Sequence, residues 1–137
     1  MNAKEFLQQA YFLDRQADLL LKKSELLRKS LYGHGKSDTP CRSANSDGFS
    51  RTIAKVVDYE KKADELVRKL VNVRLEIETA VAKVPDSRQR EVLERRYLLY
   101  QGWNEIAESM NYSKSHVLRL HKSGLDEVKK MILNDTK

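Results

Sequence analysis

Two stretches of the chain place an apolar residue at alternating steps of four and three residues. The first stripe comprises Phe6, Ala10, Leu13, Ala17, Leu20, Ser24, Leu27 and Leu31, of which only Ser24 is polar. The second comprises Tyr59, Ala63, Leu66, Leu70, Val73, Ile77, Ala80 and Val84. This spacing marks one face of an α-helix that packs in a coiled coil or bundle. We therefore predict helices over about residues 3–31 and 50–83 that pair as a long antiparallel hairpin.

Because the first helix is a little shorter than the second, the end of the second stripe near Ile77 and Val84 should meet something else. Either the carboxy-terminal part of the chain or a second copy of the protein could pack against this end of the stripe. A hairpin of this kind serves to form a homodimer or to contact a protein partner.

The composition agrees with an all-α fold. The 137 residues include only two prolines and five glycines, and aromatic residues make up 7%, which favours helices over a β-sheet core. The single cysteine, Cys41, has no partner within the chain. A disulfide framework is therefore excluded, and a reducing compartment fits.

Residues 32–49 are rich in Gly, Ser, Asp and Asn and have no apolar period. Such a segment buries too little apolar surface to offset the entropy of ordering it. We predict a mobile loop here, which is long for a connection between helices and is either functional or disordered.

Pro85 marks the clearest boundary, since proline cannot continue the preceding helix and disfavours helical geometry at Val84. We therefore divide the chain into a hairpin domain, residues 1–84, and a second domain, residues 85–137. Asp86 or Ser87 should cap a new helix that runs to about Leu99.

The stretch from Trp103 to Lys122 has the pattern of two short helices joined by a tight turn. Its apolar residues Ile106, Met110, Tyr112, Val117 and Leu120, together with the small Ala107, fall where the helices must pack on each other. Asn111 falls at the turn, where a left-handed conformation is needed, and Ser113 can cap the second helix. We interpret the stretch as a helix-turn-helix. Beyond it, residues 124–133 either extend the second helix or follow a kink at Gly124.

From Arg95 to Leu125 the chain resembles region 4 of bacterial sigma factors. The resemblance covers roughly residues 86–130. The helical amino-terminal part and the long loop are also similar to small Firmicute-phage proteins that carry such a motif, and to phage late-transcription regulators of the ArpU and RinA kind.

The resemblance implies that the second helix of the motif enters the major groove of double-stranded DNA. It places Lys114, Ser115 and Arg119 at base-reading positions and His116 and Lys122 near phosphates. The chemistry agrees, since Lys and Arg donate to guanine and Ser donates or accepts, and the net charge of +6 suits a polyanion. Leu118 departs from the basic residue usual in sigma factors, and Gly102 from the usual Ser or Thr cap.

Other residues give no sign of catalysis or of a cofactor. His116 and His121 are expected on different helix faces, as surface or phosphate-contacting residues, and no metal-ligand spacing emerges. Trp103 should be a partly buried wedge. Arg95 and Arg96 either contact phosphate or pair with nearby glutamates. The chain lacks an apolar run long enough for a membrane span and should be cytoplasmic, in a bacterial host cell.

The leading hypothesis is a sequence-specific DNA-binding regulator of phage or prophage transcription that is not an enzyme. Nothing upstream of the motif resembles the sigma segments that grip RNA polymerase, so autonomous sigma activity is not expected, although polymerase stays open as a partner. Two alternatives remain: a small terminase-like DNA-packaging subunit, and a structural coiled-coil interaction protein.

Overall fold

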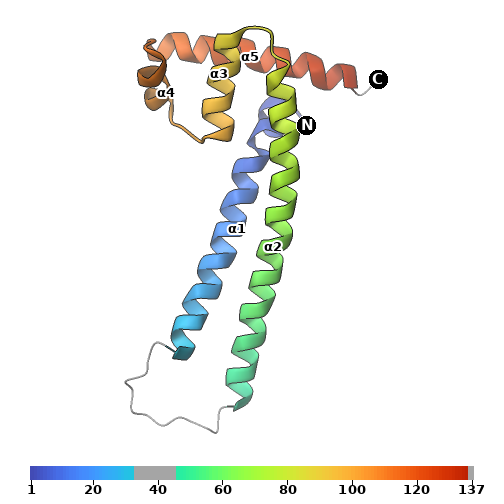
Figure 1. Cartoon of the computed structure of the whole chain (residues 1–137), viewed down its shortest axis with the longest axis vertical. Helices are drawn as coiled ribbons and strands as arrows, with labels where there is room; N and C mark the ends of the chain where they lie inside the picture. Colours follow the sequence, from blue (N-terminus) through green and yellow to red (C-terminus); the bar gives the residue numbers. More distant parts are fainter. Residues whose placement is uncertain (33–45, 136–137) are drawn as a thin grey trace. The chain divides into compact units, whose positions relative to one another are not determined.

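The computed structural model describes residues 1–32 and 46–135. Its elements are α1 (Ala3–Tyr32), α2 (Ser46–Ala82), α3 (Ser87–Leu93), the π-helical turn η2 (Glu94–Leu98), α4 (Trp103–Met110) and α5 (Lys114–Asp135) (Figure 1). No strand occurs in the part of the chain that the structure describes. The predicted all-α fold, a long hairpin followed by a helix-turn-helix region, is confirmed.

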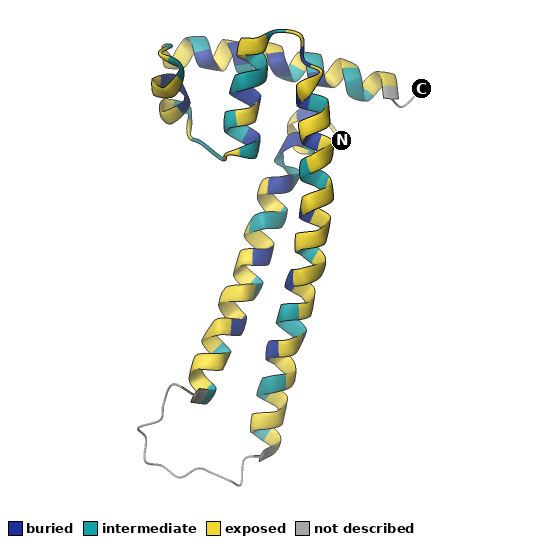
Figure 2. Cartoon of the chain, viewed as in Figure 1, coloured by how far each residue is buried: buried dark blue, intermediate teal, exposed yellow. Residues whose placement is uncertain are grey.

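Helices α1 and α2 pack against each other along the two predicted stripes. Every residue of both stripes is buried or half-buried, including Ser24. The buried residues lie on the facing sides of the two helices, and most of the outer faces are exposed (Figure 2). The apolar period therefore located the packed face of each helix correctly.

The predicted start of the second helix was too late. Residues 46–49, which we expected in the loop, form the first turn of α2. Ser46 and Asp47 are polar, but such residues favour a helix amino terminus, where free backbone donors and the helix dipole favour an acidic side chain. The rest of the predicted loop, residues 33–45, lies outside the described residues.

The chain forms two compact units. Unit 1 comprises Met1–Phe12 together with Leu70–Lys137, and unit 2 comprises Leu13–Lys69. The division into domains at residues 84 and 85 stays a prediction.

The two units bury side chains of different size. The largest fully buried side chains are Leu7, Ile77, Val81, Val84, Val92, Leu93, Ile106, Val117 and Val128, and all of them belong to unit 1. Unit 2 buries the small residues Ala17, Ser24, Val56 and Ala63. Larger side chains remove more apolar surface from water, so the stronger hydrophobic core is that of unit 1. Because Ile77 is fully buried within one chain, it is not free to meet a second copy.

The start of α3 follows the predicted capping pattern. The backbone N–H groups of Arg88 and Gln89 donate to Asp86 Oδ1 at 2.8 Å and 3.4 Å, so Asp86 rather than Ser87 is the cap. These hydrogen bonds, of which the one from the Arg88 backbone matters most, lower the pKa of the Asp86 carboxyl. The cap fixes the direction in which the chain leaves Pro85.

The helix that begins at α3 continues into the π-helical turn η2. The Leu99 N–H donates to the Glu94 carbonyl at 3.1 Å, five residues back, and Tyr100 then ends the segment with a positive φ of 58°. A π-helical turn adds one residue to the helix and rotates the side chains that follow. In this segment Tyr97 is buried.

Across the described residues, no helix combines the length and apolar character needed to cross a membrane.

Candidate nucleic-acid interface

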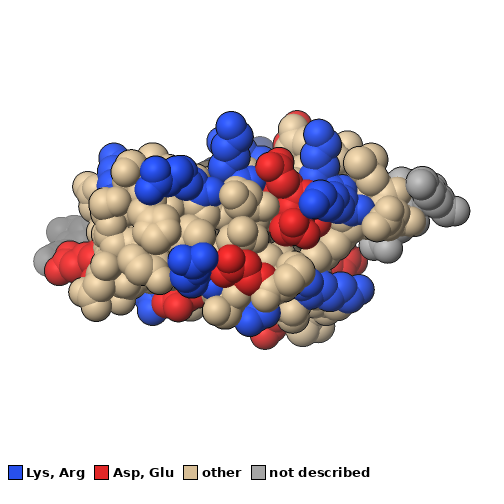
Figure 3. All heavy atoms as spheres, turned by 90° about the horizontal axis from the view of Figure 1, so that it is seen from above, with Lys and Arg blue, Asp and Glu red and all other residues tan. Residues whose placement is uncertain are grey.

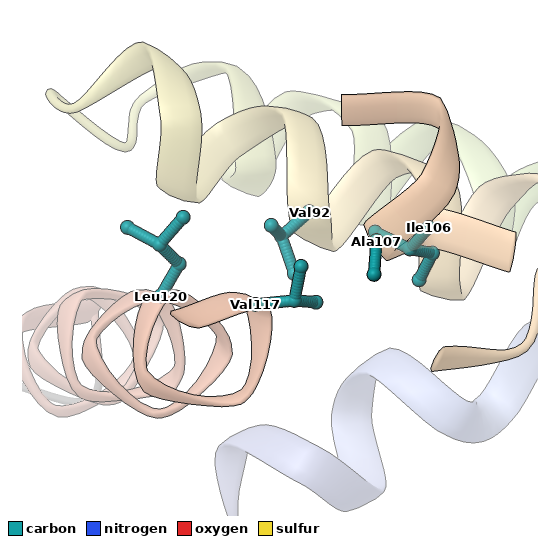
Figure 4. Packing of buried hydrophobic residues seen from close by; sticks show 5 residues of the cluster. All are labelled: Val92, Ile106, Ala107, Val117 and Leu120. Atoms are coloured by element: carbon teal, nitrogen blue, oxygen red, sulfur yellow. The ribbon is translucent and has the colours of Figure 1, made fainter. Parts of the chain in front are cut away.

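The core of the helix-turn-helix joins three helices. Val92 of α3, Ile106 and Ala107 of α4, and Val117 and Leu120 of α5 form one buried cluster (Figure 4). Trp103, Met110 and Tyr112 are partly buried and pack against it. Every residue that the sequence assigned to the packed faces of the motif therefore lies in this cluster or against it, and Trp103 is the partly buried wedge that we expected.

The turn between α4 and α5 has the predicted chemistry. Asn111 adopts the left-handed conformation, with φ 59° and ψ 41°. The Tyr112 N–H donates to the Ala107 carbonyl at 3.0 Å, and the His116 N–H donates to Ser113 Oγ at 3.1 Å. Ser113 thus caps α5, and the turn is held at both sides by hydrogen bonds.

The amino terminus of α4 lacks the Ser or Thr hydroxyl that usually caps this helix. Gly102 is the N-cap residue and has no side chain to accept a hydrogen bond. Its backbone N–H instead lies 3.4 Å from Glu105 Oε1, which is the second half of a capping box. Glu105 therefore supplies the side-chain hydrogen bond to the Gly102 backbone at this helix end.

The first two turns of α5 present a polar, basic face. Lys114, Ser115, Arg119 and Lys122 are all exposed, whereas Val117 and Leu120 point into the core (Figure 4). Within the described parts of the chain, none of the three basic residues has an ion-pair partner. Residues three and four apart share one helix face, so these side chains lie together and are free to contact a ligand.

His116 occupies a different setting from the other four predicted site residues. It is half-buried, and its ring lies 4.5 Å from the ring of Tyr112, measured between centroids. Its backbone already contacts the Ser113 cap. The imidazole is therefore placed beside the turn, at the edge of the exposed face rather than at its centre.

The surface on the α5 side of the molecule is mixed in charge. Seen from above, Lys and Arg side chains alternate with Asp and Glu side chains (Figure 3). The stretch from Lys114 to Lys122, by contrast, contains three Lys or Arg residues and no acidic residue. Any attraction for a polyanion is therefore concentrated on the start of α5 instead of being spread over a broad basic face.

A cluster of aromatic and basic side chains supports α5 from within. The Tyr97 hydroxyl and His121 Nε2 share a hydrogen bond of 2.6 Å, and the two rings stack. The Trp103 ring meets His121 edge-on at 4.6 Å between centroids, and the Arg96 guanidinium lies 4.3 Å from the centre of the Trp103 ring. The cluster ties η2, α4 and α5 together.

The expectation that His121 is a surface or phosphate-contacting residue was wrong. Burial, helped by the positive charges of Arg96 and Lys4, lowers the pKa of His121 to about 4, and burial raises the pKa of Tyr97 to about 12. His121 follows Val117 by four residues and therefore shares its inward face. The ring is half-buried, and that spacing was the signal in the sequence that could have placed it against the core.

The alternatives for Arg95 and Arg96 resolve differently. Arg95 Nε donates to Glu91 Oε2 at 2.8 Å, so Arg95 pairs with a glutamate. Arg96 packs over Trp103 and donates to the Gln101 carbonyl at 3.0 Å. Both arginines therefore hold the region together. Within residues 1–32 and 46–135, no group of three or more His, Cys, Asp or Glu side chains could hold a metal ion.

These features define a helix-turn-helix unit with a basic exposed face on its second helix. The comparisons with known proteins agree: residues 86–130 match the family model described as Sigma-70, region 4. Region 4 is a helix-turn-helix DNA-binding domain and is not catalytic. No curated protein and no solved structure gives a significant match. A region that matches this family of DNA-binding domains therefore covers residues 86–130, the span of the resemblance that the sequence suggested.

Proposed function

We propose that the protein is a sequence-specific double-stranded DNA-binding regulator of phage or prophage transcription, and that it reads its site with the start of α5. The observation that carries the proposal is the exposed face of Lys114, Ser115, Arg119 and Lys122, free of acidic residues, on a helix whose other side is locked in the core. The match of residues 86–130 to sigma region 4 supports it.

Each residue of this face has a role that fits its chemistry. Arg119 and Lys114 donate to guanine O6 and N7 in the major groove, and Ser115 donates or accepts at a neighbouring base. Lys122 neutralises a phosphate. His116, held against Tyr112 at the edge of the face, contacts the backbone and not a base.

The hairpin of α1 and α2 completes the proposal. It joins two copies of the chain as a homodimer or contacts a partner such as RNA polymerase, while the domain of residues 85–137 binds DNA. The numerous exposed apolar side chains of the two helices support this, among them Leu19, Leu26, Val57 and Val67. Large apolar surfaces are typical of interaction sites.

The proposal is tested by selecting bound sequences from random DNA and then measuring affinity for the selected site and for unrelated DNA. Arg119→Ala should weaken binding to the selected site by about 1 to 3 kcal/mol and relax the base preference at one position. The matched control is Arg68→Ala, which removes an exposed arginine from α2. That control should leave the affinity for the selected site unchanged.

Two results would count against the proposal. An Arg119→Ala protein that loses the same affinity for every sequence would assign Arg119 to a phosphate. If the wild-type protein enriches no sequence from random DNA, sequence-specific binding is excluded. The structural coiled-coil alternative and non-specific DNA binding then remain. Sedimentation separates the packaging alternative, since a packaging subunit forms a large ring whereas the regulator is a monomer or dimer.

A further inference from the structure

The base-reading face of α5 contains one apolar side chain. Leu118 is 39% exposed and does not belong to the buried cluster of the motif, to which its neighbours Val117 and Leu120 belong. It follows Lys114 by four residues and precedes Lys122 by four, so both lysines are its neighbours on the helix surface. A leucine thus sits among the cations of the proposed reading face.

The rest of the face limits which base pairs it can read. Between Lys114 and Lys122 there is no Asn or Gln, the residues that bind adenine in a bidentate way, and no Asp or Glu, which accept from cytosine. The polar side chains present are Lys, Ser, His and Arg. The strongest base contact of Lys and Arg is with guanine, and Ser115 can contact any base, so no side chain here selects an A·T pair by a bidentate hydrogen bond.

The major groove offers one apolar group to a side chain such as Leu118. That group is the C5-methyl of thymine, which apolar side chains contact. Burying Leu118 against this methyl removes apolar surface of both partners from water, whereas a cytosine at the same position presents no methyl.

Building on the proposed function, we infer that Leu118 contacts the methyl group of one thymine, so that the DNA site of this protein contains a thymine at a fixed position beside the bases read by Lys114 and Ser115. The preference for thymine at this position comes from its methyl group and not from a hydrogen bond. Leu118 is therefore a specificity-determining residue.

The test removes the methyl alone. Each thymine of the selected site is replaced in turn by deoxyuridine, which pairs as thymine does but lacks the C5-methyl. At one position the wild-type protein should lose about three- to fivefold in affinity, the effect of one buried methyl group. In Leu118→Ala the same replacement should change affinity by less than about 1.5-fold, because the partner of the methyl is gone.

Matched variants keep the result interpretable. Leu99→Ala removes a leucine that is 61% exposed between η2 and α4, and it should retain the full deoxyuridine effect. Leu118→Met keeps an apolar side chain of similar reach and should retain most of it. Should Leu118→Ala fail to fold, Leu118→Gln provides a polar replacement of similar length, and circular dichroism reports the helicity of each variant.

The outcomes separate this inference from the proposed function. If the wild-type protein selects a DNA site but no deoxyuridine replacement weakens binding, or if the penalty persists in Leu118→Ala, the role of Leu118 is overturned and the regulator proposal stands. If the wild-type protein selects no site, both fail together.

Discussion

His121 is the residue whose surroundings differ most from what its type suggests. It lies on the inward face of a helix that also carries the proposed DNA contacts, hydrogen-bonded to Tyr97 and in contact with Trp103. Because burial lowers its pKa from 6.5 to about 4, the ring is neutral at pH 7 in the folded protein. The unfolded chain protonates it nearer pH 6.5.

This difference predicts a pH-dependent stability. Between pH 6.5 and pH 4 the unfolded state binds more protons at His121 than the folded state, so stability rises with pH over this window. The contribution of neutral His121 is fully present above pH 6.5 and is lost as the pH falls towards 4. Urea unfolding at several pH values measures it.

The variant His121→Gln isolates the effect, since glutamine keeps a polar group near Tyr97 but does not titrate. Its free energy of unfolding should depend less on pH between 4 and 6.5 than that of the wild type. Parallel slopes for wild type and His121→Gln would refute a buried neutral His121.

At the residue scale, the sequence predicted what depends on local chemistry. The turn residue and two helix caps are as expected: Asn111 is left-handed, Ser113 caps α5 and Asp86 caps α3. Capping and left-handed geometry follow from a few neighbouring residues. The position of His121 was missed, since its burial depends on Tyr97 and Trp103 from other elements. The roles of the five proposed DNA-contacting residues stay predictions.

At the scale of elements, α5 decides between the two alternatives for the end of the chain. It runs without interruption from Lys114 to Asp135, so Gly124 extends the helix and introduces no kink. A Cβ atom added at Gly124 would lie 3.1 Å from Leu93 Cδ1 and 3.2 Å from Leu93 Cγ. Glycine therefore lets α5 approach the fully buried Leu93 of α3 closely.

A double-mutant cycle tests this close approach. Gly124→Ala alone should fail to stabilise the protein, because the gain in helix propensity of about 1 kcal/mol is offset by overpacking against Leu93. In a Leu93→Ala background, which itself costs about 2 to 5 kcal/mol, the same change should stabilise by about 1 kcal/mol. Denaturant unfolding of the four proteins gives the coupling. Equal effects of Gly124→Ala in both backgrounds would show that Leu93 moves aside freely.

The apolar period predicted the long helices well, because the stripes of α1 and α2 repeat over many turns. The π-helical turn η2 was not predicted. Its extra residue is selected by how Tyr97 and Arg96 pack on α5 and Trp103, and no local pattern of residues demands it. The start of α2 was also misplaced, because Phe49 is the only apolar residue among residues 46–49 and its side chain is exposed, so no apolar period marks the first turn of the helix.

At the scale of the whole molecule, the two units should differ in local stability. Unit 1 holds the largest fully buried side chains, whereas unit 2 buries alanines, a serine and a valine. Full burial of a large aliphatic side chain contributes about 1.5 to 3 kcal/mol, and a single methyl group much less. Local opening of the hairpin segment in unit 2 therefore costs less free energy than local opening of unit 1.

Hydrogen exchange of the full chain measures this difference. Amides of α1 and α2 within unit 2 should exchange at least about tenfold faster than those of α3 and the middle of α5, after correction for intrinsic rates. The test is extended by Ser24→Leu, which would place a large apolar side chain in the buried stripe, and by the exposed-site control Arg68→Ala in the same unit. Equal protection factors throughout the chain would mean that it opens as one cooperative unit.

If the exposed face of α5 reads DNA as proposed, its length sets how many base pairs one copy of the protein can read. From Lys114 to Lys122 the helix rises about 12 Å, which matches only three to four base pairs at about 3.4 Å each. In the remainder of α5, Gly124 and Val128 are buried, so one side of the helix there packs against the rest of the unit. A site of four base pairs recurs by chance about once in every few hundred base pairs, so a lone copy would recognise very many places in any genome. For the proposed regulator, choosing a single promoter then requires a second DNA-binding surface, held at a fixed distance by the rest of the molecule.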